Sequence, residues 1–259
     1  MNDLNAAINF VPTFVLVFFR MAGLMIMSPL FGSTRVPRRV KVMFASVAAL
    51  GAVGAIPQPV QFPSSIWELT LAIGAEICFG LAMGLIVSLT FIAAQWAGEM
   101  IGQQMGLNLS EVFDPQFGQS GSLIGDLYFM LTMVLFLLIG GHRILISAVQ
   151  ESLITLPPLS LVFDAPLFEI LLDMLTAATI LALRLAAPMF FTMLVVDLVM
   201  GCIGRAMPQF NIMTAGLSIR AIVGILVLIL GITLSSEALQ ASLADQLALV
   251  HQLWGHHGR

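Results

Sequence analysis

Six long apolar runs constrain this chain more than any other feature of its sequence. They cover residues 6–31, 40–56, 66–96, 123–140, 167–200 and 217–234. Only 9% of the 259 residues are charged, against about 25% in a soluble domain. Because backbone polar groups need internal partners in lipid, such runs must form helices or a closed barrel. The runs are continuous and do not alternate with a period of two, so the sequence predicts an all-α integral membrane protein.

The lengths of these runs predict something other than a simple bundle of spans. A bilayer span needs about 20 apolar residues, but the third and fifth runs are longer and the second is shorter. We expect one helical membrane domain, residues 1–259, that ends in a polar tail, residues 235–259. Some of its helices should pack against protein rather than cross lipid, and Pro188 should kink the fifth run.

Two charged residues lie deep inside these runs. Arg20 lies in the first run and Glu76 in the third. A charge within a membrane helix is costly and almost always faces protein or water. We therefore expect Arg20 to face protein or water and Glu76 to point inward. Gly80 and Gly84 add small-residue spacing to the third run, of the kind that lets helices approach closely.

The strongest basic cluster follows the first run and consists of Arg35, Arg38, Arg39 and Lys41. By the positive-inside rule this loop is cytoplasmic. Orientation of the chain is a sufficient role for the cluster, and a docking surface for cytoplasmic parts is the alternative. Aromatic residues are not interleaved with basic ones, so the sequence does not indicate nucleic-acid binding.

The longest run that is not strongly apolar covers residues 96–122. Gly98, Gly102 and Gly106 are four apart and would form a smooth strip on a helix, against which another backbone can pack. We expect this helix to pass Leu107 and to end in the polar segment that contains Asp114-Pro115. A plain connection between two helices is an equally good interpretation of the polar part.

Enzymatic chemistry has little support in the sequence. No cluster has metal-ligand spacing and no glycine-rich loop is followed by Lys-Ser or Lys-Thr, so we expect no metal and no nucleotide cofactor. Cys78 and Cys202 lie in apolar runs, where a buried small apolar role is expected. An intramembrane serine protease would need a paired Ser and His. The candidates for that pair, Ser120, Ser122 and His142, form only a loose pattern.

A stand-alone transporter or channel is the main alternative that the residues leave open. Ionisable side chains inside apolar runs can line a path for protons or solutes. They can equally form ion pairs that hold buried helices together. The residues in question are Glu76, Asp126, Arg184 and Asp197.

Four motifs occur in order along the chain. They are Arg20 with 29-PLFG-32 and Val36-Pro37; 98-GExxGQQMG-106 with Asp114-Pro115; Gly141-His142 with Ser152 and Pro157; and Arg205 with Pro208, Gln209 and Asn211. Together they resemble the FliR family of bacterial flagellar export-gate proteins and its virulence-system relatives. The resemblance runs almost from end to end of the chain.

That resemblance implies a non-enzymatic role in the bacterial inner membrane, in the flagellar basal body. Members of this family assemble with FliP and FliQ around a central pore, through which unfolded flagellar substrates pass. Other membrane components of the export apparatus are implied as further partners. Their helices form bent hairpins, much of the assembly is lifted out of the bilayer, and energy comes from the proton motive force and a separate ATPase.

The resemblance also assigns provisional roles to residues. It implies a loop over residues 106–122 that reaches into the pore and helps to plug it, with candidates Gly106, Asp114, Pro115, Gly118 and Gly121. Helix-packing or assembly candidates are Gly98, Glu99, Gly102, Gln103, Arg205, Pro208 and Asn211, and Asp197 is a further contact candidate. The histidine-ended tail matches nothing specific in the family, and we assign it no role.

Overall fold

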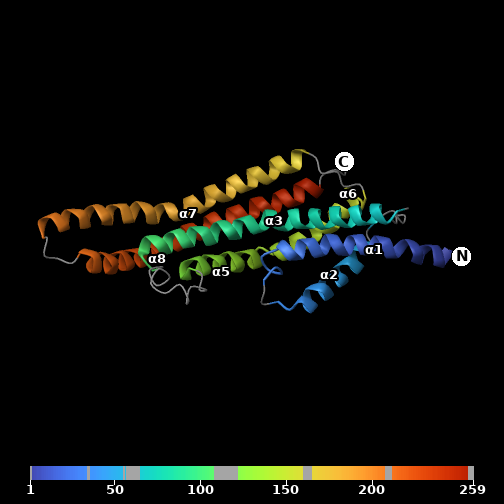
Figure 1. The fold of residues 1–259 in the computed structure, drawn as a ribbon, viewed down its shortest axis with the longest axis horizontal. Coiled ribbons are helices and arrows are strands. Elements are labelled where there is room, and N and C mark those ends of the chain that lie inside the picture. The colour runs from blue at the N-terminus through green and yellow to red at the C-terminus, as the bar shows by residue number, and fades with distance from the viewer. Residues whose placement is uncertain are drawn as a thin grey trace. The chain divides into compact units, whose positions relative to one another are not determined.

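The computed structural model describes residues 2–33, 36–54, 56, 65–107, 122–159, 165–207 and 212–255 (Figure 1). All regular secondary structure within these ranges is helical, as the apolar runs predict. The seven helices described are α1 (Asn2–Met27), α2 (Arg38–Val53), α3 (Ile66–Met105), α5 (Leu123–Leu138), α6 (Gly141–Thr155), α7 (Ala165–Ala206) and α8 (Ile212–Gly255).

The chain divides into two compact units. Unit 1 comprises Met1–Leu89, Phe136–Met174 and Leu243–Arg259, and unit 2 comprises Thr90–Leu135 and Leu175–Ser242. Four helices (α3, α5, α7 and α8) contribute one part to each unit.

In unit 1, α1 packs against α2, α6 and the first part of α3 (Figure 1). The α2 surface that is buried consists of Ala45, Ala49 and Ala52. Alanines at this helical spacing have almost no side-chain bulk, so the two helix axes can lie close together. α6 buries Leu145, Ala148, Val149 and Leu153, again at helical spacing.

In unit 2, the second part of α3 packs with α5, α7 and α8. Phe91 of α3 and Phe129 of α5 meet edge to face, with ring centroids 5.6 Å apart, which is a favoured aromatic geometry. A Cβ atom at Gly224 of α8 would lie on the side chain of Met105 at the end of α3. The bulky end of α3 therefore fits against a position on α8 that has no side chain.

The end of α3 differs from the prediction. The helix stops at Met105, before the polar segment and Asp114-Pro115. Gly106 has φ +76°, and its N–H donates to the Gln103 carbonyl (3.0 Å) while the Leu107 N–H donates to the Gly102 carbonyl (3.1 Å). This is a Schellman cap, which glycine adopts without the steric cost that other residues incur at positive φ. A capping glycine, and not proline, ends the helix.

The predicted interruption at Gly140-Gly141 is confirmed. α5 and α6 meet at an angle of 63°, and Gly140 has φ +76°. A Cβ atom at Gly141 would overlap the ring of Phe136. The bend therefore depends on one glycine for its backbone conformation and on the next for space.

Fewer helices suit a bilayer than there are apolar runs. Among the helices of the described ranges, four are long and apolar enough, or five if the bent α5–α6 pair counts as one span. α2, with 16 residues, is only about 24 Å long at 1.5 Å per residue.

α8 continues to Gly255, beyond the last apolar run, because Leu239, Leu243, Leu247 and Val250 still recur on one buried face. The buried role expected for Cys78 and Cys202 is wrong, because both are exposed.

Candidate functional site

α1 and α3 cross in unit 1 at a surface made of glycines. A Cβ atom at Gly23 of α1 would lie 2.5 Å from the Ile77 carbonyl oxygen of α3. A Cβ atom at Gly80 would overlap the Arg20 carbonyl oxygen, and one at Gly84 would lie 2.9 Å from the Leu24 carbonyl oxygen. The small-residue spacing at Gly80 and Gly84 thus marks a real close approach. Gly23 lies one turn after Arg20 and belongs to the same contact, although the predicted small-residue spacing includes only Gly80 and Gly84.

This close approach brings Arg20 and Glu76 together although they are 56 residues apart in the sequence. Arg20 Nε donates to Glu76 Oε2 at 2.5 Å, and Arg20 Nη2 donates to Glu76 Oε1 at 3.1 Å. Both side chains are completely buried. The expectation that Arg20 faces protein and that Glu76 points inward is confirmed. The two-point geometry is the strong form of the arginine–carboxylate pair.

α6 provides the remaining hydrogen-bond acceptors of Arg20. Arg20 Nη1 donates to Ser152 Oγ at 3.0 Å, and Nη2 donates to the Leu156 carbonyl oxygen at 3.1 Å, just beyond the end of α6. The last carbonyls of a helix lack partners within it and carry partial negative charge. The Phe79 ring centroid lies 4.8 Å from the guanidinium carbon. The Arg20 side chain of α1 therefore binds groups on α3 and at the end of α6, which links three helices and joins two of the four motifs.

The arrangement suits a structural connection and not catalysis. A buried ion pair is tolerated only when its geometry is good and its remaining hydrogen-bonding groups are satisfied, and Arg20 meets both conditions. Removing one partner would leave a charge without compensation. The network therefore fixes how α1, α3 and α6 are placed within unit 1.

The turn after α1 is constrained in the same way. The Gly32 N–H donates to the Ser28 carbonyl at 2.6 Å. A Cβ atom at Gly32 would lie 2.7 Å from the carbonyl oxygens of both Ile26 and Ser28. The last residue of the 29-PLFG-32 motif is thus a glycine because the turn has no room for a side chain.

In unit 2, the start of the predicted glycine strip contacts α5. A Cβ atom at Gly98 would lie 2.5 Å from the Ile124 carbonyl oxygen and 2.6 Å from Gly125 Cα. The Glu99 side chain lies beside Gly125, Gly102 is buried and Gln103 is exposed. These contacts lie within the chain, and a role of the same residues in assembly stays a prediction.

Polar contacts in unit 2 link α3, α5, α7 and α8. Tyr128 and Ser235 hydroxyls are 3.1 Å apart, and those of Thr90 and Ser242 are 3.3 Å apart. Arg220 of α8 donates to Asp197 of α7 at 2.5 Å. This pair is 39% and 47% exposed, in contrast to the buried pair of unit 1. Asp197, an expected contact residue, therefore joins two helices.

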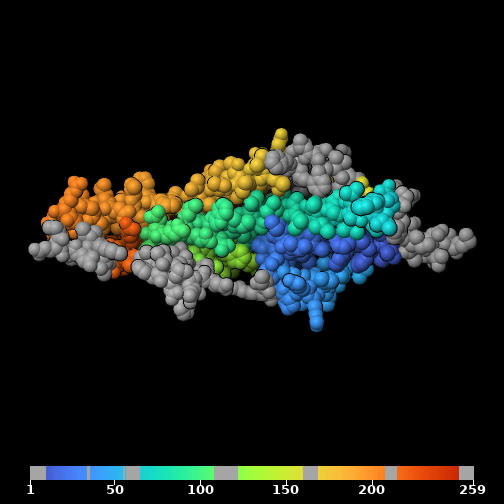
Figure 2. Space-filling model, in the orientation of Figure 1, coloured from blue at the N-terminus to red at the C-terminus, as the bar shows by residue number. Residues whose placement is uncertain are grey.

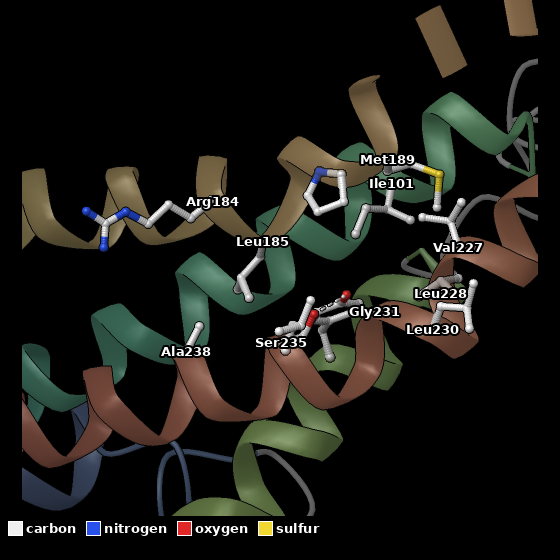
Figure 3. A pocket seen from close by; sticks show the side chains of 13 residues that line it. Ile101, Arg184, Leu185, Met189, Val227, Leu228, Leu230, Gly231, Ser235 and Ala238 are labelled. Carbon is white, nitrogen blue, oxygen red and sulfur yellow. Dashed lines mark hydrogen bonds between the residues drawn. The ribbon is translucent and has the colours of Figure 1, made fainter. Parts of the chain in front are cut away.

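Unit 2 also holds an apolar cavity of about 270 Å3, shown in Figure 3. Its lining comes from α3, α5, α7 and α8 and includes Ile101, Leu185, Met189 and Leu228. Tyr128, Arg184 and Ser235 are the polar residues of its lining, and the Arg184 guanidinium points away from the other labelled side chains (Figure 3). Among the described residues that line it there is no carboxylate, cysteine or histidine, so the lining offers the Ser235 and Tyr128 hydroxyls no base of the usual kinds.

Several predicted residues lie outside the described ranges. They are Arg35, Asp114, Pro115, Gly118, Ser120, Gly121, Pro208 and Asn211. Ser122 is described and has a structural role, because its hydroxyl accepts the Gly125 N–H at the start of α5. In the part of the chain that the structure covers, no group of three or more His, Cys, Asp or Glu residues could hold a metal ion.

α7 and α8 expose most of their apolar surface. Only 22% of the apolar window of α7, and 6% of that of α8, is buried. Surfaces of this size in a chain with so few charges require lipid or protein around them. The class that emerges is an all-helical integral membrane protein with a buried ion pair between Arg20 and Glu76 and broad uncovered apolar faces.

Comparison with known proteins identifies the family. The chain belongs to family 1 of the bacterial export proteins, which matches residues 11–245. It is 30% identical over 229 residues to the flagellar biosynthetic protein FliR of Bacillus subtilis, covering 87% of this chain and 88% of the other. FliR of Escherichia coli is 30% identical over 206 residues, or 80% and 78% of the two chains. The Shigella flexneri surface presentation of antigens protein SpaR is 26% identical over 215 residues, 82% of each.

This membership confirms the family that the four motifs suggested. The family is non-enzymatic and belongs to the flagellar and type III export apparatus of the bacterial inner membrane. Other components of that apparatus are therefore its partners in general terms. The stand-alone transporter and the protease, which the residues alone left open, are set aside.

Proposed function

We propose that the chain is a subunit of the flagellar export gate, in which it forms with FliP and FliQ the pore for unfolded flagellar substrates. Membership of the export-protein family is the observation that carries this proposal. The flagellar assignment is supported by relatives named as flagellar proteins in several bacteria, with 30% identity in Bacillus subtilis and Escherichia coli.

The exposed faces of α7 and α8 support a protein partner. Leu198 and Leu230 are among the large apolar residues that they leave uncovered. The same helices carry the exposed ion pair of Asp197 with Arg220. They also carry the exposed Arg184, for which the described residues provide no partner. Charged groups are costly against acyl chains, whereas protein can supply acceptors for them. Helices of other subunits are therefore the better cover for this face.

The loop over residues 106–122 would act as the movable closure of the pore. Gly106 supports this proposal, because its capped, left-handed conformation ends α3 abruptly and lets the chain leave the helix. The other loop candidates, Asp114, Pro115, Gly118 and Gly121, lie outside the described residues. A glycine-containing loop can seal a pore loosely and still yield to a passing chain.

Co-purification tests the partners. The chain, tagged and co-expressed with FliP and FliQ, is expected to yield one stable complex of all three in detergent. Leu230→Glu should reduce recovery of the partners at least tenfold, because it places a charge on the face that they cover. Trp67→Glu is the matched control, since Trp67 and Leu230 are both 78% exposed but lie on different units. Recovery of a well-behaved single chain without partners would contradict the proposal.

Ion leakage tests the loop. Deletion of residues 115–121 should leave the complex intact and make membranes that contain it permeable to small ions.

Gly102→Leu should instead prevent assembly, because Gly102 is buried and a leucine there would force the helices apart. A membrane that stays tight after the deletion would contradict the plug, and normal assembly of Gly102→Leu would contradict the packing role.

A further inference from the structure

α2 has two opposite apolar faces, and only one of them is covered by the chain. Ala45, Ala49 and Ala52 are buried, and the helix packs on α1. The opposite face exposes Val40, Met43, Val47 and Leu50, at the spacing of one helical stripe. Phe44 lies at the edge of this face and packs on Phe31, with ring centroids 4.9 Å apart. Met43 and Val47 are each 64% exposed. Figure 2 shows α2, in blue at the lower edge, with its outer side uncovered in that view.

The outer face is suited to a surrounding without water. Between Lys41 and the end of α2 at Val53 there is no charged residue. The only polar side chain in that interval is Ser46, and its Oγ donates to the Val42 carbonyl at 2.8 Å. Backbone groups are paired within the helix, so nothing on this face needs a hydrogen bond from outside. In this respect α2 differs from α7 and α8, whose outer faces carry charges.

The basic residues lie at one end of this stripe. Arg38, Arg39 and Lys41 occupy the first turn of α2, and none of their side chains makes a hydrogen bond or ion pair with another described residue. Positive charge in the first turn opposes the helix dipole, so these residues do not stabilise the helix. Their charge is therefore available to an external anion.

The length of the apolar stripe indicates which surroundings the outer face of α2 suits. Residues 42–53 extend about 18 Å along the helix, well short of the ~30 Å hydrocarbon core. A stripe that is too short to span, with cations at one end, matches the boundary between acyl chains and anionic headgroups.

We propose that α2 is a membrane contact for anionic phospholipids, in which Arg38, Arg39 and Lys41 bind lipid phosphates and the outer apolar stripe lies among acyl chains. This contact concerns unit 1 and does not depend on which subunits cover α7 and α8. It gives the basic cluster a binding role in addition to its effect on chain orientation.

Lipid binding tests the basic end. The full chain, or its complex with the partner subunits, is purified in a neutral detergent and titrated with phosphatidylglycerol and, separately, with phosphatidylcholine. Arg38→Gln/Arg39→Gln/Lys41→Gln should weaken phosphatidylglycerol binding on the order of 100-fold at low salt and leave phosphatidylcholine binding unchanged. In the full chain purified without partner subunits, Arg143→Gln/Arg184→Gln/Arg205→Gln removes three exposed cations from other helices and should weaken phosphatidylglycerol binding less than threefold.

Two results of this titration would overturn the proposal. Equal losses in both triple variants would mean that the basic end of α2 binds lipid no better than any other exposed cation. Unchanged lipid binding together with loss of a co-purifying acidic protein would assign the cluster to a protein partner instead. The specific loss should also fade between 0.05 and 0.5 M salt, roughly as the Debye length shortens.

Cysteine accessibility tests the apolar stripe. Val47→Cys, in a Cys78→Ala/Cys202→Ala background, is treated with a water-soluble maleimide after reconstitution. The thiol should be protected in vesicles that contain phosphatidylglycerol, and labelled at least tenfold faster in the triple-glutamine variant or in phosphatidylcholine vesicles. Protection that is independent of lipid and of the basic residues would show that protein covers the stripe, and rapid labelling in all vesicles would show that water does.

Discussion

Removing one member of the Arg20–Glu76 pair should destabilise the protein severely. Glu76→Met would take away two of the four hydrogen bonds that Arg20 donates and leave its guanidinium buried without a counter-charge. Breaking a buried ion pair in this way costs about 3–5 kcal/mol. Because about 1.4 kcal/mol corresponds to a tenfold change in an equilibrium constant, the unfolding equilibrium constant should increase by roughly two to four orders of magnitude.

The double variant separates pairing from packing. Arg20→Met/Glu76→Met replaces both charges with flexible apolar side chains, and such replacements are often close to neutral. Its free energy of unfolding should therefore lie within about 2 kcal/mol of the wild-type value, far from the sum of the two single effects. SDS-titrated unfolding of the purified chain in mixed micelles, followed by tryptophan fluorescence, measures all three variants.

The exposed pair of unit 2 is a matched control. Arg220 and Asp197 approach to 2.5 Å, as Arg20 and Glu76 do, but they are 39% and 47% exposed. Asp197→Met should cost less than about 1 kcal/mol, because exposed ion pairs contribute little. Equal costs for the two pairs, or additive single effects at the buried pair, would refute the argument that burial makes Arg20 and Glu76 interdependent.

Three glycine substitutions follow from the same structure. Gly80→Ala should cost about 1–3 kcal/mol through overpacking, because its Cβ would meet the backbone of α1; unfolding in mixed micelles should detect this. Gly74→Ala, six residues earlier and with no atom within 4 Å of its Cβ, should be neutral or stabilise by up to about 1 kcal/mol. Gly106→Ala should destabilise the end of α3 by about 1–2 kcal/mol and speed amide exchange at Met105, and unchanged exchange would contradict the cap.

Local features of the sequence predicted the elements well. Continuous apolar runs predicted helices, Gly140-Gly141 predicted a break, and four ordered motifs predicted the family. The end of α3 differs from the prediction because Gly106 caps the helix before the chain reaches Asp114-Pro115, and a glycine after an apolar helix is a stop signal in its own right. α8 extends past its apolar run because an amphipathic repeat continues a helix without high mean hydropathy.

The sequence by itself determined that Arg20 and Glu76 could not face lipid, because a charge in an apolar run needs a partner wherever the run lies. It could not identify that partner, since residues 56 positions apart in the sequence meet only if α1 and α3 cross close to Arg20 on one helix and to Glu76 on the other. The tertiary structure decided this through Gly23, Gly80 and Gly84, which let the two backbones approach. It also decided which face of α2 is covered. The stripe of large residues and the stripe of alanines are both apolar in sequence, but only the alanines are small enough to fit against α1.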